Sequence, residues 1–216
     1  MKVLLLRSRK LMDLLFSYSA VNWIFLLILS RWERNLIDLN SNTFIKNSVD
    51  LVSKLEDSHI PQNSTLTSFD ITNMYTNIPI SETIDIIKEN LTKTNTSTEQ
   101  INEIIEVLKV ITKQNYFTFE NKFWSQEDGL PMGSPISSLL AEIYLQHYET
   151  QLIFKTQHAK NIQYWYRYVD DILLLYHGNQ RQCEIFRSHL NKINKKKSSS
   201  QQNMKTINPS TSLTSL

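Results

Sequence analysis

Three aspartates stand in stretches of the chain that are otherwise apolar or aromatic. Asp170 and Asp171 are adjacent within YWYRYVDDILLLYHG, and Asp70 lies near the end of TLTSFDIT. An ionised carboxylate removed from water costs several kcal/mol unless a cation accompanies it. The aspartate pair has no Lys or Arg beside it, and Arg167 is the nearest basic residue in sequence. Because Mg²⁺ prefers carboxylate oxygens and substrate phosphates, this pattern indicates phosphoryl or nucleotidyl transfer.

Each of these features also has an ordinary structural explanation. A lone Asp-Asp pair usually lies in a solvated turn, and an aspartate after a strand is often a cap or turn former. The Gly133-Ser134-Pro135 junction is of a kind that ordinarily just begins a helix. The order of these features along one chain favours the chemical interpretation, in which Asp70 supplies the third carboxylate of a two-metal site.

Strands are predicted on both sides of the acids. Residues 65–72 predict a short buried strand, with Leu66 and Phe69 near the first aspartate. Residues 164–176 predict a β-hairpin with Val169-Asp170-Asp171 at its tip. Residues 116–126 alternate around Glu120-Asn121, which predicts a second hairpin.

Apolar residues at helical spacing predict the supporting helices, at about 81–92, 98–113 and 135–150, with one more in QRQCEIFRSHLNKIN. We expect Ser81 to cap the first of these helices. Ser97 and Gln100 are spaced as a capping box for the second. Ser134 would cap the third, with Pro135 at its first position.

Composition sets limits on the remaining possibilities. The 216 residues carry a net charge of +2, which does not by itself indicate a nucleic-acid or membrane partner. Cys183 is the single cysteine, so no intramolecular disulfide can form. Residues 11–29 are apolar and about long enough to span a bilayer, but Asp13 and Asn22 interrupt them and basic residues flank both ends. We favour a buried helix or a segment without a native partner; a membrane span is the alternative.

Three sequence motifs of the chain resemble motif boxes of the reverse transcriptases, and they occur in the same order along the chain. YVDD resembles their metal-binding box, FDITNMYTNIP their first palm box, and GLPMGSPISSLLAEIYLQHYE their glycine-loop box. Together with FTFENKFWSQ, these boxes resemble the Penelope-like retroelement branch, over about residues 40–194. The resemblance implies an α/β (α+β) fold: a polymerase palm whose antiparallel sheet is backed by helices, with incomplete fingers and no thumb.

The resemblance implies catalytic and metal-binding roles for Asp70, Asp170 and Asp171. A primer 3′-hydroxyl would attack the α-phosphorus of a dNTP, with two Mg²⁺ ions, or Mn²⁺, activating the hydroxyl and neutralising the triphosphate. The expected partners are an RNA template, a DNA primer and dNTP, with a DNA template as a further option and no membrane. An intact element of this kind would act inside the cell, in the nucleus.

The resemblance also implies substrate contacts outside the three acids. The backbone of Ile71 would contact the phosphates of the incoming nucleotide. Tyr75 matches the aromatic gate that excludes a 2′-hydroxyl, and a packed core tyrosine is its alternative. Met132, Gly133 and Ser134 would lie against the nascent base pair and template, Met132 standing where many reverse transcriptases have Gln.

The resemblance divides the chain into three parts. Residues 1–35 are an unmatched apolar segment, 36–194 a partial fingers and palm domain, and 195–216 a polar tail expected to be disordered. The family's fingers box, its later palm strands, its thumb and the GIY-YIG endonuclease of many members are not found. Read in a shifted frame, one permitted codon choice from Ser199 onward gives FTTEYENNQSINFLDLT, which contains the missing strands. We therefore hypothesise a degraded or wrongly read copy whose frame is lost near Lys197.

Two other functions remain open from the sequence. The chain could be a noncatalytic remnant that at most binds nucleic acid, because recognisable fingers and thumb segments are missing. It could also be a membrane-anchored protein in which YVDD arose by chance, but this requires all of the palm boxes to be accidental. We expect little or no processive polymerisation from these 216 residues alone, since a misplacement of about an ångström costs roughly 10²-fold in rate.

Overall fold

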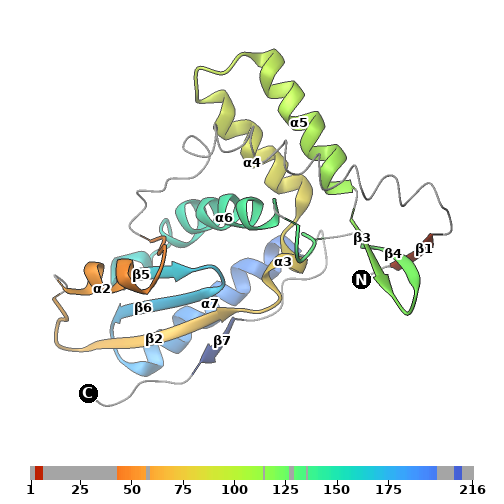
Figure 1. Cartoon of the computed structure of the whole chain (residues 1–216). Coiled ribbons are helices and arrows are strands. Elements are labelled where there is room, and N and C mark those ends of the chain that lie inside the picture. Colours follow the sequence, from red (N-terminus) through yellow and green to blue (C-terminus); the bar gives the residue numbers. More distant parts are fainter. Residues whose placement is uncertain are drawn as a thin grey trace. The chain divides into compact units, whose positions relative to one another are not determined.

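The computed structural model describes residues 3–6, 43–56, 59–113, 115–126, 129–134, 136–198 and 207–210. The chain divides into two compact units. Figure 1 labels their helices and strands. Unit 1 comprises Met1–Asp38 and Tyr75–His147, and unit 2 comprises Leu39–Met74 and Tyr148–Leu216. The apolar segment 11–29 lies outside the described residues. Among the described helices, none is both long enough and apolar enough to cross a membrane.

Among its described elements, unit 1 contains a pair of helices, a small antiparallel sheet and two further helices. The described strands of this sheet are ordered β1-β4-β3. The unit boundary falls after the first residue of α3 and before the last residue of α6. The elements are β1 (Val3–Leu6), α3 (Met74–Asn77), α4 (Ile80–Thr92), α5 (Thr98–Lys113), β3 (Tyr116–Phe119), β4 (Lys122–Gln126) and α6 (Ser137–Tyr148).

The α4–α5 pair is held by the apolar stripes that the sequence predicts. Ile87 and Leu91 of α4 and Leu108 of α5 are fully buried. Each such side chain contributes about 1.5–3 kcal/mol when it is removed from water. The predicted capping box is confirmed: the N–H of Ser97 donates to Gln100 Oε1, and the N–H of Gln100 donates to Ser97 Oγ, both at 3.3 Å.

Two predicted helix caps are wrong. Helix α4 begins at Ile80 directly after Pro79, whose extended backbone and carbonyl start the helix, so Ser81 lies inside it. Helix α6 begins at Ser137, whose hydroxyl donates to the carbonyl of Pro131 at 2.7 Å. The buried hydroxyl of Ser134 makes no hydrogen bond within the described chain. A tight turn before α6 occupies the positions that the predicted cap required.

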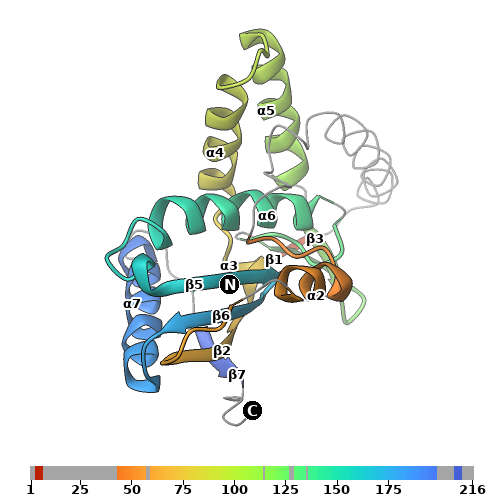
Figure 2. The ribbon, with the colours of Figure 1, turned by 90° about the vertical axis from the view of Figure 1, so that its left-hand side faces the viewer.

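Unit 2 is built on a four-stranded antiparallel sheet with the described strand order β5-β6-β2-β7 (Figure 2). The predicted α/β class with an antiparallel sheet is confirmed. The elements of the unit are α2 (Ser48–Glu56), β2 (Ser64–Ile71), a π-helical turn (Glu149–Ile153), a 3-10 turn (Ala159–Asn161), β5 (Ile162–Tyr168), β6 (Asp171–His177), α7 (Gln180–Ser198) and β7 (Ile207–Ser210).

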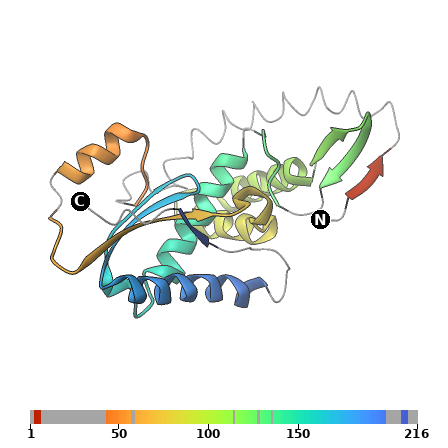
Figure 3. The same cartoon turned by 90° about the horizontal axis from the view of Figure 1, so that it is seen from below.

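Alternation along the strands gives the sheet of unit 2 a packed face. Phe69 of β2 lies opposite Ile172 of β6, and both are buried. Tyr176 of β6 stacks on Phe186 of α7 with ring centroids 5.3 Å apart, which places α7 against this face (Figure 3). Leu66, three residues before Phe69, is 37% exposed, so β2 is buried on one face rather than on both.

In the last part of the chain, the structure describes residues 195–198 and 207–210, and these two stretches differ from the expectation. We expected residues 195–216 to lack regular structure, because their composition is polar. Helix α7 instead continues through Ser198, and Ile207–Ser210 form β7, which pairs antiparallel with β2 along the edge opposite β6. The backbone of a short polar segment can complete a sheet edge even where its side chains offer little apolar surface.

Candidate active site

The antiparallel register of unit 2 brings the predicted acids to one end of the sheet. Asp70 on β2 lies directly opposite Asp171 on β6, so both side chains project from the same face. Directly opposite residues of an antiparallel pair have Cβ atoms about 4.5–5.5 Å apart. Asp170 lies in the two-residue turn before β6, and its carbonyl accepts a hydrogen bond from the N–H of Ile71 at 3.0 Å. The two acidic sequence motifs are thus joined through the backbone.

Asp171 holds its proton more tightly because of its surroundings. Partial burial raises the pKa of Asp171 above its ordinary value, and the negative charges of Asp170 and Asp70 raise that pKa further. Within the described part of the chain, no Lys or Arg forms an ion pair with any of the three acids. A cation placed at this end of the sheet would therefore relieve their mutual repulsion.

The donor set fits a divalent hard cation, although a three-ligand cluster is not preformed. Among the described residues, no group of three His, Cys, Asp or Glu side chains is arranged to hold a metal ion. The described side chains therefore do not form a ready-made three-ligand site, and the close convergence of the three carboxylates stays a prediction. Mg²⁺ usually takes one or two carboxylates and completes its shell with water and substrate phosphates. Asp70 and Asp171 face each other across two strands, and Asp170 adjoins them in the turn, so the three acids offer enough carboxylates for that smaller set.

The turn that carries Asp170 has an uncommon backbone. Val169 has φ +55°, a left-handed conformation that is rare for a β-branched residue. Such a residue costs on the order of 1–3 kcal/mol and persists where the surrounding structure determines the backbone. The guanidinium of Arg167 donates from Nη1 to the carbonyl of Val169 at 3.3 Å, and this bond fixes one side of the turn.

A buried ion pair lies behind this turn. Arg167 is fully buried, and its Nε donates to Glu149 Oε1 at 2.6 Å. The indole N–H of Trp165 donates to the same oxygen at 2.9 Å. The nearest basic residue in sequence therefore bonds to Glu149 rather than to the paired aspartates. Sequence reasoning missed Glu149; an arginine within an apolar strand was the available signal that a buried acid must accompany it.

A comparison with known proteins decides the family. The model of the reverse transcriptase (RNA-dependent DNA polymerase) family matches residues 9–210. The chain belongs to the reverse transcriptase family. This match covers both hairpins and all of the acids described above.

Solved structures with a similar fold include two telomerases. Apo telomerase from Candida tropicalis superposes with a TM-score of 0.56 at 13% identity, over 82% of this chain and 34% of that one. Telomerase from Candida albicans in complex with a TWJ fragment of telomeric RNA gives 0.58 at 16% identity, over 87% of this chain and 34% of that one. At these identities the likeness shows the fold alone, that of the polymerase palm. The chain spans about a third of each telomerase chain. No curated protein sequence matches the chain.

Tyr75 lies on the short helix α3 in unit 1. It is half-buried, and its hydroxyl lies 3.4 Å from Ser138 Oγ of α6. Its carbonyl accepts a hydrogen bond from the N–H of Leu130 at 2.7 Å. A Cβ added at Gly129 would lie 2.3 Å from the carbonyl oxygen of Thr76, and Gly129 has φ +80°. The glycine of the EDGLPMGSP stretch therefore allows that stretch to approach the backbone of α3 closely.

The predicted template-contacting residues form a turn in unit 1. Met132 is 72% exposed, and Gly133 has φ +91° with open space where a Cβ would stand. Ser134 is buried, and its hydroxyl is unpaired within the described chain. In unit 2, the N–H of Ile71 donates to the carbonyl of Asp170, so in this structure it is not directed to a phosphate. The substrate contacts implied for these residues stay predictions.

Proposed function

We propose that the chain is the palm portion of an RNA-directed DNA polymerase from a retroelement of the Penelope-like branch. In its reaction, the 3′-hydroxyl of a DNA primer paired to an RNA template would attack the α-phosphorus of a dNTP, lose its proton and displace pyrophosphate. The observation that supports this most strongly is the pairing of Asp70 with Asp171 across β2 and β6, with Asp170 in the adjoining turn. That arrangement occurs in a chain whose family is reverse transcriptase.

The acids would perform their task through two divalent cations, Mg²⁺ or Mn²⁺. When bound, such ions neutralise the triphosphate and lower the pKa of the attacking hydroxyl. Asp70 and Asp170 would hold the ions, and Asp171 would add a third carboxylate beside them. Tyr75 would crowd a 2′-hydroxyl and so favour deoxyribonucleotides. For an intact element we expect the reaction to take place in the nucleus.

The first test measures Mn²⁺ binding to the full chain with Asp170→Asn as the variant. Loss of one carboxylate should weaken binding at least about tenfold, since one such ligand is a large share of the protein's contribution to the site. Asp85→Asn is the matched control, because Asp85 is an exposed aspartate on α4 of unit 1. An affinity that Asp170→Asn leaves unchanged would contradict the proposal.

A second test measures primer extension on an RNA template with Mg²⁺ or Mn²⁺. We expect little extension from the 216 residues and restored extension once fingers and thumb segments of the family are joined to them. In the restored enzyme, Asp170→Asn should abolish extension. Tyr75→Ala should raise the ratio of ribonucleotide to deoxyribonucleotide incorporation; an unchanged ratio would mean that Tyr75 only packs.

The second candidate function is a noncatalytic remnant that at most binds nucleic acid. One observation favours it: among the described residues, the three acids are not arranged as a ready-made metal cluster. Under this alternative, the restored enzyme binds nucleic acid but shows no extension that depends on Asp170. The hypothesis of a shifted frame also stays a proposal, and the coding nucleotides of Ser199–Leu216 test it directly.

A further inference from the structure

The buried pair of Glu149 and Arg167 makes contacts that a packing role alone does not require. Arg167 Nε and Nη2 both face the Glu149 carboxylate, at 2.6 Å from Oε1 and 3.5 Å from Oε2. Both side chains are almost wholly removed from water. Burying two charges is expensive, and apolar residues of similar volume often serve stability equally well or better. A stabilising role alone therefore explains this pair poorly.

The remaining edge of the guanidinium is directed to the turn. Nη1 of Arg167 donates to the carbonyl of Val169 at 3.3 Å, while Nε and Nη2 face the acid. A planar guanidinium presents five donors in fixed directions, so the orientation imposed by Glu149 also sets the direction of Nη1. A lysine has one compact ammonium in this position and cannot reproduce that geometry.

The turn is a part of the structure where such support matters. Val169 and Asp170 are the two central residues of the turn. Val169 has a positive φ and Asp170 does not, and this combination fits a type II′ turn. That position strongly prefers glycine, and a β-branched residue there tends to leave the conformation. On the other side of the turn, the N–H of Ile71 holds the carbonyl of Asp170 at 3.0 Å. The two successive carbonyls of the turn are thus each fixed by one hydrogen bond.

We propose that Arg167, oriented by Glu149, is a positioning residue for Asp170: it holds the carbonyl of Val169 and thereby keeps the turn in the conformation that presents the Asp170 carboxylate to a divalent cation. This inference rests on the proposed function, in which Asp170 is a metal ligand. It adds a pair of residues, outside the acidic motifs, whose effect on the metal passes through the backbone of the turn.

The experiment measures Mn²⁺ affinity in the full chain under conditions where circular dichroism shows it folded. Arg167→Lys keeps the charge and loses the fixed fork, and we expect an affinity about tenfold or more lower, as for other groups that orient metal ligands. Leu190→Ala is the control for lost stability, because Leu190 is a buried residue of α7 in the same unit. It should leave the Mn²⁺ affinity of the folded chain unchanged.

A rescue variant separates positioning from packing. Glycine adopts positive φ without steric cost, so Val169→Gly should restore most of the affinity that Arg167→Lys removes. A purely structural role for Arg167 predicts no such rescue. Should Arg167→Lys fail to fold, Glu149→Gln carries the same test with the same rescue, because it keeps the size of the side chain and most of its hydrogen bonds.

The same measurements distinguish failure of the proposed function from failure of the positioning role. If Asp170→Asn leaves Mn²⁺ binding unchanged, the proposed function fails, and the inference fails with it. If Asp170→Asn weakens binding while Arg167→Lys behaves like Leu190→Ala, the carboxylate site stands and the positioning role is overturned. Weakened binding in Arg167→Lys together with rescue by Val169→Gly supports the positioning role.

Discussion

The two β-hairpins that the structure describes each have a loop of two residues. They differ in how well the residues of the loop suit its backbone conformation. Glu120 and Asn121 join β3 to β4 with φ of 50° and 55°, which fits a type I′ turn in which asparagine is well tolerated. Val169 and Asp170 join β5 to β6, and a β-branched residue occupies the position of positive φ. The first turn agrees with its local sequence, and the second does not.

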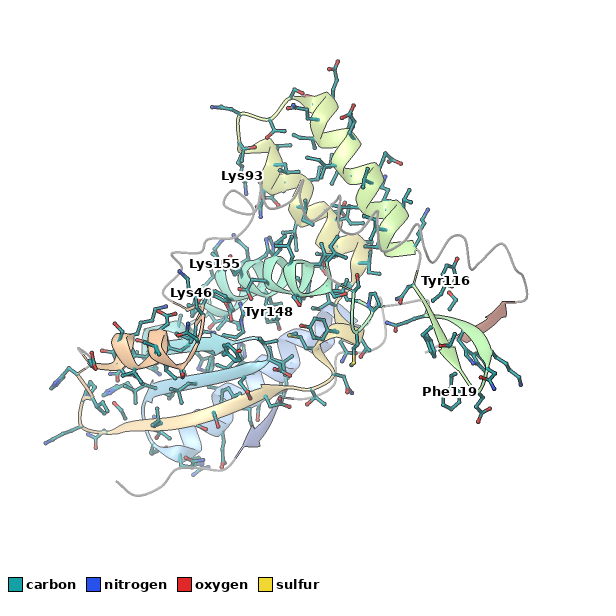
Figure 4. The ribbon with its side chains drawn as sticks, viewed as in Figure 1. Lys46, Lys93, Tyr116, Phe119, Tyr148 and Lys155 are labelled. Carbon is teal, nitrogen blue, oxygen red and sulfur yellow. The ribbon has the colours of Figure 1, made fainter. Side chains whose placement is uncertain are left out.

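The surroundings of the two hairpins explain why both turns persist. Tyr116 and Phe119 lie on the strand β3 (Figure 4), and Phe119 is 59% exposed, so solvent surrounds much of that hairpin. The second hairpin has Ile172, Leu174 and Arg167 buried along its strands. A misfit turn residue survives where buried neighbours determine the backbone, and such misfits concentrate at functional sites. The difference between the hairpins thus points to the second as the functional one.

The largest expected effect comes from removing the acid behind the second hairpin. Glu149→Leu leaves Arg167 buried without its partner, which should lower the free energy of unfolding by about 3–5 kcal/mol. Glu120→Leu, the matched change of an exposed glutamate in the first turn, should alter it by less than about 0.5 kcal/mol. Urea denaturation of the two variants measures both values. Equal changes would mean that the pair contributes no more to the fold than an exposed side chain.

Local patterns made both hairpins predictable. Period-two alternation and a polar pair between two apolar runs placed the Glu120-Asn121 turn and the Asp170 turn correctly. The Ser97–Gln100 capping box was equally accessible, because its two partners lie three residues apart. In these three cases the residues that determine the element lie close together in sequence, and the predictions were confirmed. The Ser81 cap was an equally local prediction and was wrong, because the helix begins at Ile80, directly after Pro79.

Features that depend on distant residues could not be predicted in the same way. Glu149 and Arg167 are separated by 18 positions and meet through the packing of a π-helical turn against β5. The strand β7 pairs through its backbone with β2, which lies far earlier in the chain, and its composition gives little sign of this. The absent cap of Ser134 has a related cause: the Ser134 hydroxyl is buried without a partner among the described residues, while the hydroxyl of Ser137 donates to the carbonyl of Pro131.

A second, smaller effect sharpens the contrast between the turns. Valine at a positive φ costs about 1–3 kcal/mol, and glycine adopts the same backbone conformation without that cost. The greater freedom of glycine in the unfolded chain lowers the resulting gain in stability by roughly 1 kcal/mol. For Val169→Gly we therefore expect a stabilisation of between zero and about 2 kcal/mol. Glu120→Gly in the first turn should change stability by less, because glutamate is not β-branched. Thermal denaturation of the two variants, compared with the unaltered chain, measures the difference; a destabilised Val169→Gly would show that the turn is not strained.

The smallest effect expected is a dependence on pH that is confined to the unit of the second hairpin. The ring of His158 lies 4.8 Å from that of His189 and 5.7 Å from that of Phe186, which stacks on Tyr176 of β6. Burial lowers the pKa of His158 below its ordinary value of 6.5, and the charges of His189 and Lys160 lower it further.

The sign of this effect follows from proton binding. The unfolded chain holds a proton on His158 more tightly than the folded chain does, so the free energy of unfolding decreases as pH falls below about 6.5 and levels off below the lowered pKa. His158→Gln should flatten that part of the pH dependence. His177→Gln, which changes an exposed imidazole of β6, should keep it. Amide exchange measured at two pH values should show lower protection at the lower pH in β5, β6 and α7. Protection in β3 and β4 should not change in this way, because that hairpin contains no histidine. An equal loss of protection in both hairpins would exclude His158 as the cause.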